Sequence, residues 1–556
     1  MLPPAAALLV PVITLSPTSR YDRLGDIDRD SASEILVPQF EPITRGGTMT
    51  QRLRPSSLAL AKPDTIHRVR EVLDRAGFDE PHIAERLGSK EVIELAFGPL
   101  DCPRLLRRTR DGDPLSTLIR LFLVGAPVPS AAVRATLEPM DPLDWVGLGL
   151  IELERDIARR VVVLMPSGDF LIASDCLLPD GSQRRDHVLG VSGSALNVAQ
   201  AMIQTPACWS LDLGTGCGYL ALLAAGFSQR VLGTDLNPRA VALARFNCLL
   251  NHVTNVEHLE GDLFEPAGDL QFERIVSNPP FVVSPEDSLL FRDSGLKGDE
   301  ISERIIRRTP AHLAEGGFAQ VRCNWVRISG RNWLERLTGW LAGSGCDAWI
   351  IHSHTDSTDV YADNWLRQDE VTDRERFVDQ YDRWMTYYDQ QQIEAIDSGL
   401  ITLRRRAGGR NWIRVDTDRS VNHPNGEAIL VGFAARDLLE RYSDHEALLG
   451  LRLRCRPELR FVQFLKPTES GWRIENAHCE LGALQFAGEV NALVFHLLAL
   501  CQGEHPLATV LAQVAGRLGQ EPDAIGPAGL AAARSLVEQG FLWPADDATR
   551  TEISSV

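Results

Sequence analysis

The sequence has no C-x-x-C pair, although its 556 residues include ten cysteines. The cysteines are scattered, and none belongs to a Cys/His cluster with the spacing of metal ligands. This pattern argues against a structural zinc site. We therefore expect reduced, mostly buried thiols, no bound metal and a cytoplasmic protein.

An excess of positive charge is also missing. The chain has 57 Lys+Arg against 75 Asp+Glu, which gives a net charge of -18. A surface that wraps nucleic acid would need a broad basic patch, so any contact with a polyanion must be local. Arg304, Arg307 and Arg308 share one helical face and are the candidates for a contact with RNA phosphate. Such a cluster, like the "RRR" run at 404–406, is more often a solvated face.

The chain start lacks the features of a secretory signal. The stretch "MLPPAAALLVPVITL" is apolar, but it has no basic n-region and prolines interrupt it. Residues 1–48 show little periodicity, and we expect a disordered leader or an over-long assigned start. No membrane contact is expected.

The length and composition indicate a soluble globular protein of about three or four domains. In residues 49–180, "STLIRLFLV", "GAPVP" and "SAAVRATLEPM" predict helix, turn and helix, and two strands follow around "PSGD". This order predicts a winged-helix-like N-terminal domain. Residues 424–556 end in three apolar helices and predict an α+β, winged-helix-like C-terminal domain. The N-terminal module could serve in protein docking or dimerisation as well as in DNA binding.

Residues 181–423 alternate short apolar strands with helices, which predicts an α/β domain with a doubly wound sheet. The predicted strands are "WSLDLG", "RVLGTD", "VEHLEGD", "FERIVSNPP", "GFAQVRCNW", "DAWIIHSH" and "GLITLRRR".

The first predicted strand ends in a glycine-rich loop, "LDLGTGCGYL". Gly214, Gly216 and Gly218 allow the backbone to turn tightly and a ligand to approach it. Because Tyr219 stands where a dinucleotide fingerprint needs its third glycine, the spacing is G-x-G-x-G. Asp235 ends the second strand, 23 positions after Asp212, near the distance at which a carboxylate reaches ribose hydroxyls. The loop therefore predicts a nucleoside-containing ligand.

The fourth strand ends abruptly in "IVSNPPF". Pro279 and Pro280 remove two backbone donors, so ladder pairing cannot continue. The strand end then presents the amide of Asn278 and the flat ring of Phe281. All four strand ends should meet at the carboxyl edge of the sheet, where open α/β sheets bind ligands.

Together these motifs resemble the class I S-adenosylmethionine (SAM) methyltransferases, and among them the HemK-type glutamine-N5 methyltransferases. The resemblance covers residues 190–325 or so. It implies a Rossmann-like, seven-stranded methyltransferase sheet with SAM as cofactor. Asp235 would bind the ribose hydroxyls and Asp262, in "EGDLFEP", the adenine amino group. The implied cofactor-binding residues are Asp212, Gly214, Thr215, Gly216, Gly218, Asp235, Leu236, Asp262, Leu263 and Asn278.

The resemblance also implies a role for "NPPF". A planar nitrogen is a poor nucleophile because its lone pair is delocalised. The side-chain oxygen of Asn278 and the carbonyl of Pro279 can accept its two hydrogens and direct the lone pair at the methyl group. Phe281 can stack on the planar target. The predicted catalytic residues are Asn278, Pro279, Pro280 and Phe281.

The methyl acceptor stays open at this stage. A protein glutamine, of the release-factor type, is the first hypothesis. HemK-type enzymes usually carry Tyr where this chain has Phe281, so an adenine or guanine amino group of RNA or DNA is the alternative. A further alternative is a winged-helix regulator that senses SAM without catalysis.

Three other features of the sequence have simple structural interpretations. Ser192 and Ser194 lie where the family closes over the methionine end of SAM, although a helix N-cap is the simpler role. His352 and His354 are too few for a metal site. The aromatic stretches "DNWLRQ" and "DRWMTYYDQQQ" could form a lid, a substrate wall or ordinary helix packing.

Overall fold

The computed structural model describes residues 62–89, 102–176, 183–368, 374–408, 410–417, 425–457, 459–468, 471–481 and 488–545. The predicted leader, residues 1–48, lies outside the described residues, and so do the predicted domain boundaries near 180 and 423.

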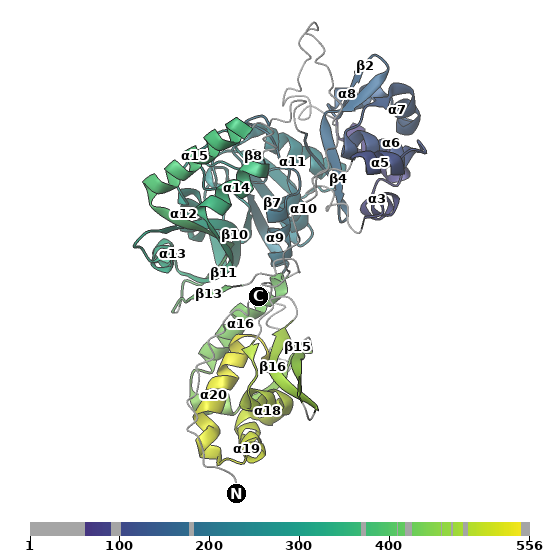
Figure 1. Cartoon of the computed structure of the whole chain (residues 1–556). Coiled ribbons are helices and arrows are strands. Elements are labelled where there is room, and N and C mark those ends of the chain that lie inside the picture. Colours follow the sequence, from purple (N-terminus) through teal and green to yellow (C-terminus); the bar gives the residue numbers. More distant parts are fainter. Residues whose placement is uncertain are drawn as a thin grey trace.

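A large sheet lies at the centre of the chain (Figure 1). It has eight strands in the order β13-β11-β12-β10-β9-β6-β7-β8. β12 runs antiparallel to both of its neighbours, and the other strand pairs are parallel. The strands are β6 (Ala207–Leu213), β7 (Ser228–Asp235), β8 (Val256–Glu260), β9 (Phe272–Ser277), β10 (Leu313–Ile328), β11 (Cys346–Ser357), β12 (Ile393–Arg405) and β13 (Ile413–Thr417).

All seven predicted strands are confirmed, but the predicted strand number was wrong by one. The extra strand, β13, pairs with β11 at the edge of the sheet. It was missed because charged Arg414 and Asp416 interrupt a stretch of only five residues, so no apolar run marks it.

Helices cover both faces of this sheet, as the doubly wound prediction requires. Neighbouring residues of β9 show the two faces: Val276 packs in one hydrophobic cluster with α9, α10 and α11, and Ile275 packs in another with α12 and α13. The helices are α9 (Gly193–Ala201), α10 (Tyr219–Ala225), α11 (Pro238–Leu250), η2 (Glu265–Ala267), α12 (Glu300–His312), α13 (Trp333–Leu341), α14 (Thr358–Gln368) and α15 (Arg374–Gln391).

The N-terminal region places a helix–turn–helix and a hairpin in the predicted order. Its helices are α2 (Pro63–Arg75), α3 (Glu80–Leu87), α5 (Cys102–Arg108), α6 (Pro114–Leu118), η1 (Ile119–Val124), α7 (Ser130–Leu137) and α8 (Pro142–Gly147). Its strands are β1 (Val128–Pro129), β2 (Ile151–Glu154), β3 (Ile157–Arg160), β4 (Val162–Ser167) and β5 (Phe170–Asp175). The winged-helix-like character of this region stays a prediction.

The β4–β5 hairpin joins this region to the central domain. Asn247 on α11 accepts from the Ala173 amide at 2.8 Å and donates to its carbonyl at 2.9 Å. Asn251, one turn later, binds the Leu171 backbone in the same way. One hydrophobic cluster runs from Ile66 to Val276. This cluster contains residues from both sides of the expected boundary near 180, and the division into domains stays a prediction.

The C-terminal region contains two small sheets and a set of helices. The helices are α16 (Gly426–Arg441), α17 (His445–Leu449), α18 (Ala492–Leu500), α19 (Leu507–Leu518) and α20 (Pro522–Glu538). Strands β14 (Arg452–Cys455), β18 (Gln502–Pro506) and β19 (Leu542–Pro544) form one sheet, and β15 (Leu459–Thr468), β16 (Gly471–Leu481) and β17 (Gly488–Glu489) the other. A winged-helix-like fold for this region also stays a prediction.

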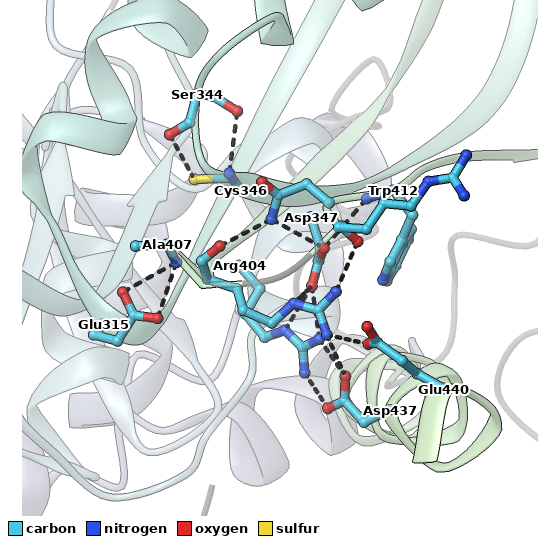
Figure 2. A network of polar contacts seen from close by, with 12 residues as sticks. Glu315, Ser344, Cys346, Asp347, Arg404, Ala407, Trp412, Asp437 and Glu440 are labelled. Carbon is cyan, nitrogen blue, oxygen red and sulfur yellow. Dashed lines mark hydrogen bonds and ion pairs between the residues drawn. The ribbon is translucent and has the colours of Figure 1, made fainter. Parts of the chain in front are cut away.

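Helix α16 connects the C-terminal region to the central sheet (Figure 1). Its first half packs Ile429 and Phe433 against Trp349 of β11, and its last turns contribute Leu438 to the C-terminal core. Figure 2 shows the polar contacts at this junction. Arg404 of β12 donates to Asp347 at 2.7 Å and to Asp437 of α16 at 2.6 Å.

This junction corrects the interpretation of the "RRR" run as a solvated face. Arg404 is buried and lies beside Asp347 and Asp437 (Figure 2). Arg406 donates to Glu440 at 2.5 Å. The aspartates and the glutamate that bind these arginines come from β11 and α16, so the sequence around residues 404–406 could not reveal them.

Close packing at the junction leads to a stability prediction at Gly432. A Cβ atom there would lie 2.3 Å from the Trp349 ring. Gly432→Ala should therefore destabilise the protein by about 1–3 kcal/mol, since overpacking outweighs the gain in helix propensity. The matched control is Gly516→Ala in α19, where a Cβ meets nothing within 4 Å and should stabilise slightly. Urea unfolding measures both, and equal effects would contradict the packing argument.

Candidate active site

The glycine-rich loop leaves β6 at the carboxyl edge of the sheet. All three glycines have positive φ, at 76°, 54° and 84° for Gly214, Gly216 and Gly218. A Cβ on Gly214 or Gly216 would meet nothing within 4 Å, whereas one on Gly218 would lie 3.0 Å from Ala244. The first two glycines thus leave space that a ligand can enter, and the third allows α10 and α11 to pack closely.

Asp212, near the end of β6, holds this loop in place through hydrogen bonds. Its side chain is fully buried and accepts hydrogen bonds from the Thr215 hydroxyl at 2.7 Å and the Ala221 amide at 3.0 Å. Burial raises the pKa of Asp212 to about 7. These contacts assign Asp212 and Thr215 a structural role in shaping the loop, and direct binding of the cofactor by either residue stays a prediction.

The raised pKa of Asp212 predicts a pH-dependent stability. The unfolded carboxyl has a pKa of about 4, so between about pH 4 and pH 7 the folded state holds a proton that the unfolded state releases. The stability that this group contributes is present below pH 4 and is lost as the pH rises to 7. In Asp212→Asn the titration is gone, and the amide keeps an acceptor for Thr215 and Ala221.

Urea unfolding at pH 5 and pH 8 tests this expectation. The unfolding free energy of Asp212→Asn minus that of the wild type should be larger at pH 8 than at pH 5. Taking this difference cancels the titration of all other groups. The same difference at both pH values would show that the Asp212 pKa is not raised.

Asp235 lies at the end of β7, directly beside the loop. Its carboxylate accepts the Gly216 amide at 2.9 Å and the Asn237 amide at 2.8 Å, and the residue is only partly buried. A carboxylate offers about four acceptor positions, so two remain for other donors. The next residue, Leu236, keeps 59% of its surface exposed, which leaves an apolar side chain open to a ligand at the same strand end.

Asp262 follows β8 and has a partner that was not predicted for it. Arg304 of α12 donates to its carboxylate at 2.7 Å, and both side chains stay partly exposed. Leu263 has a positive φ of 51°, and its carbonyl accepts from the Thr234 hydroxyl at 3.0 Å. The arginine leaves further lone pairs of Asp262 available.

The other two arginines of the proposed RNA contact also have partners within the chain. Arg307 donates to Glu303 at 2.7 Å, and the Arg308 guanidinium lies over the Phe264 ring. No described contact brings these arginines to the strand ends that carry the glycine loop and "NPPF". Their contact with RNA stays a prediction.

Asn278 shows the most informative hydrogen bonding at this edge. Its Nδ2 donates to the Ser194 hydroxyl of α9 at 3.1 Å. Its Oδ1 is buried and has no hydrogen-bond partner among the described residues. Ser192 caps α9 by accepting from the Ala195 amide, and its hydroxyl lies 3.0 Å from that of Ser194. The α9 start thus fixes the Asn278 amide while its oxygen remains available as an acceptor.

Phe281 is only 8% exposed and is covered on one side by a guanidinium. The Arg322 Cζ lies 5.5 Å from the centre of its ring. Pro279 is buried and Pro280 partly buried between these two residues. Stacking of Phe281 on a target stays a prediction.

The aromatic insertion, α14 and α15, holds the chain just after "NPPF". The Tyr361 hydroxyl accepts from the Val283 amide at 3.2 Å, and the Tyr388 hydroxyl donates to the Val283 carbonyl at 2.9 Å. Phe281, Trp384 and Tyr388 share one hydrophobic cluster. Of the roles considered for this stretch, helix packing is confirmed. Its support of the site was missed, because nothing in the local sequence ties a tyrosine to a backbone 78 or 105 residues earlier.

The two histidines of β11 have ordinary polar contacts. His352 Nε2 lies 3.1 Å from Asp397, and His354 lies 3.5 Å from Asp356. Within the described part of the chain, no three His, Cys, Asp or Glu side chains gather as a metal site would require. None of the described helices has the length and apolar character needed to cross a lipid bilayer.

Comparisons with known proteins agree with this geometry. Residues 192–325 match the family model described as "Methyltransferase small domain", and residues 75–162 match a "Domain of unknown function (DUF7059)". A putative protein N5-glutamine methyltransferase of Methanocaldococcus jannaschii is 36% identical over 118 residues, which cover 20% of this chain and 59% of the relative. The release factor glutamine methyltransferase of Escherichia coli is 33% identical over 147 residues, 23% of this chain and 51% of the relative.

A third relative has a different named target. The ribosomal protein uL3 glutamine methyltransferase of Xanthomonas campestris is 33% identical over 121 residues, 20% of this chain and 39% of the relative. The chain thus spans about half the length of the curated relatives that it matches. Its central domain resembles a class I SAM methyltransferase of the HemK type, as the motifs predicted.

Proposed function

We propose that the chain is a SAM-dependent N-methyltransferase that modifies the side-chain amide of a protein glutamine. The observation that carries this proposal is the Asn278 amide. Its nitrogen is held by Ser194, and its buried oxygen has no partner among the described residues. Leaving a buried acceptor unsatisfied costs free energy, so such a group at a strand end points to a donor supplied by a ligand.

The residues at this edge fit SAM. The open space at Gly214 and Gly216 accommodates a ligand close to the backbone, and Asp235 retains acceptor positions for ribose hydroxyls. Asp262 and Leu236 would lie on the adenine side. When bound, SAM supplies an electrophilic methyl group. The named targets of the relatives, release factors and ribosomal protein uL3, support a glutamine as the acceptor.

The chemistry required of the chain is modest. An amide nitrogen does not attack readily while its lone pair is conjugated with the carbonyl. Asn278 Oδ1 and the Pro279 carbonyl would accept its two N–H groups and orient the lone pair toward the methyl group, an interaction that strengthens as positive charge develops on nitrogen. Fixing the two reacting atoms in line supplies a further part of the acceleration.

A base amino group in RNA or DNA is the second candidate. It is favoured by Phe281, because HemK-type enzymes usually carry Tyr at this position. The contact of Arg304, Arg307 and Arg308 with RNA belongs to this candidate. For either candidate the cytoplasm remains our proposed location, supported by the cysteines with described side chains, all of which are free thiols.

Methyl-labelled SAM added to a fractionated cell extract tests the function. A glutamine target predicts a labelled protein band that survives nuclease, disappears with protease and contains methylated glutamine by peptide mass spectrometry. Label that disappears with nuclease would favour the base. SAM binding without transfer to any fraction would contradict both and favour the SAM-sensing regulator.

A further inference from the structure

One face of β10 continues the candidate site beyond Asn278. In the parallel pairing of β9 with β10, Val321 lies opposite Ser277. Arg322 is the next residue, so it lies beside Asn278 on the neighbouring strand. In the strand order β10-β9-β6-β7-β8, the Asp235 and Asp262 ends lie on the opposite side of β9. Arg322 is therefore on the side of Asn278 that is away from the proposed cofactor residues.

The two polar side chains that flank Arg322 on this face are both hydrogen-bonded. Gln320 accepts from the Ile203 amide at 2.8 Å and so anchors the chain after α9. Asn324 donates to Tyr361 at 2.8 Å and accepts from Ser398 at 2.8 Å. Arg322 lies between them, and its Nε is buried with no hydrogen-bond partner among the described residues.

Arg322 is also a buried cation without a carboxylate near it. It is 9% exposed, its guanidinium lies over the Phe281 ring, and Tyr361, Cys323 and His354 are its other described neighbours. Burial lowers the pKa of Arg322, and none of the groups that act against this effect is a carboxylate. A cation–π contact offsets only part of the cost of burying a charge. Arg404, which is also deeply buried, does have carboxylate partners.

We propose that Arg322 binds a carboxylate of the methyl acceptor, next to the nitrogen that receives the methyl group. This proposal rests on the proposed function and adds a specificity residue to it. A guanidinium presents a planar fork of donors that matches a carboxylate in two parallel hydrogen bonds. An acidic side chain or a chain terminus close to the modified glutamine would supply that group.

A carboxylate fits this position better than a nucleic-acid phosphate. Proteins hold phosphate backbones with several exposed arginines and lysines. Arg322 is a single, buried guanidinium, and the exposed arginines on α12 already contact Glu303 and Asp262. The net charge of -18 also gives no general attraction for a polyanion.

The test compares wild type, Arg322→Gln, Arg322→Lys and Arg230→Gln on the labelled acceptor protein after its isolation. Arg322→Gln should raise the KM for the acceptor by about 10-fold or more, the effect of losing a charge-assisted pair. SAM affinity by calorimetry should change less than about twofold, because Arg322 does not face the proposed cofactor residues. Arg322→Lys keeps the charge without the planar fork of donors, so its KM for the acceptor should lie between those of the wild type and Arg322→Gln. Arg230→Gln, an exposed control near the amino end of β7, should match wild type.

A second set of measurements changes the acceptor protein and keeps the enzymes the same. Replacing Asp and Glu residues near the modified glutamine with Asn and Gln should raise the KM of the wild-type enzyme and leave that of Arg322→Gln unchanged. An unchanged KM in a folded Arg322→Gln would overturn the proposal. The proposal would also fail if every acceptor variant raised the KM of the wild type and of Arg322→Gln by the same factor. If both Arg322 variants fail to fold, the residue is structural and the proposal fails.

Failure of the proposed function has a different signature. Wild-type enzyme that transfers no methyl group to any acceptor would remove the function and this inference together. Transfer to a nuclease-sensitive acceptor, with a KM that depends on Arg322, would assign a phosphate in place of the carboxylate.

Discussion

Replacing Asn278 with alanine should lower the rate of methyl transfer by about 100-fold or more and leave SAM affinity nearly unchanged. The reason lies in the two ends of the amide. Ser194 holds the nitrogen at 3.1 Å, so the oxygen is already placed before a target arrives. An acceptor that needs no reorganisation acts mainly on the transition state, where the target nitrogen becomes positive.

Two measurements separate this role from a structural one. Calorimetry gives the SAM dissociation constant, and initial rates at saturating SAM give the turnover of the variant. Ser194→Ala is the matched control: it removes the bond that orients Asn278 and leaves the acceptor in place, so the rate should fall by less. An Asn278→Ala variant with the full rate would return "NPPF" to the role of a turn.

Much of the central domain could be predicted from the sequence because its signals are local. Each core strand is a short apolar run, and the loop after β6 requires three positive φ angles, which glycines at 214, 216 and 218 supply. The two prolines after Asn278 end β9 through the loss of two amide donors. Parallel strands then bring Asp212, Asp235, Asp262 and Asn278 to one edge.

The features that could not be predicted depend on partners far away in the chain. Tyr361 and Tyr388 bind the backbone of Val283, and Arg404 is buried because Asp347 and Asp437 come to it from β11 and α16. Arg322 shows the converse case. In sequence it is one arginine among many, and only the fold reveals that it is buried beside Asn278 without a carboxylate.

Asp235 should control the other half of the site, the affinity for SAM. Asp235→Ala should weaken SAM binding by about 30-fold, or about 2 kcal/mol, which is the cost of losing charge-assisted hydrogen bonds in a partly buried site. The carboxylate has a second function that adds to this loss. It accepts the Gly216 amide at 2.9 Å, so it also holds the glycine loop in the open conformation that admits a ligand.

Calorimetry on Asp235→Ala, with the unfolding midpoint measured alongside, tests this assignment. Glu257→Ala is a suitable control because Glu257 is an exposed carboxylate on the neighbouring strand β8 and should leave SAM affinity unchanged. At saturating SAM the folded Asp235→Ala enzyme should recover most of its turnover, since β6 lies between β7, which carries Asp235, and β9, which carries Asn278. Unchanged affinity would remove Asp235 from the cofactor site. A turnover that stays low at saturating SAM would instead mean that the glycine loop, once released from Asp235, no longer aligns the methyl group with the nitrogen that Asn278 holds.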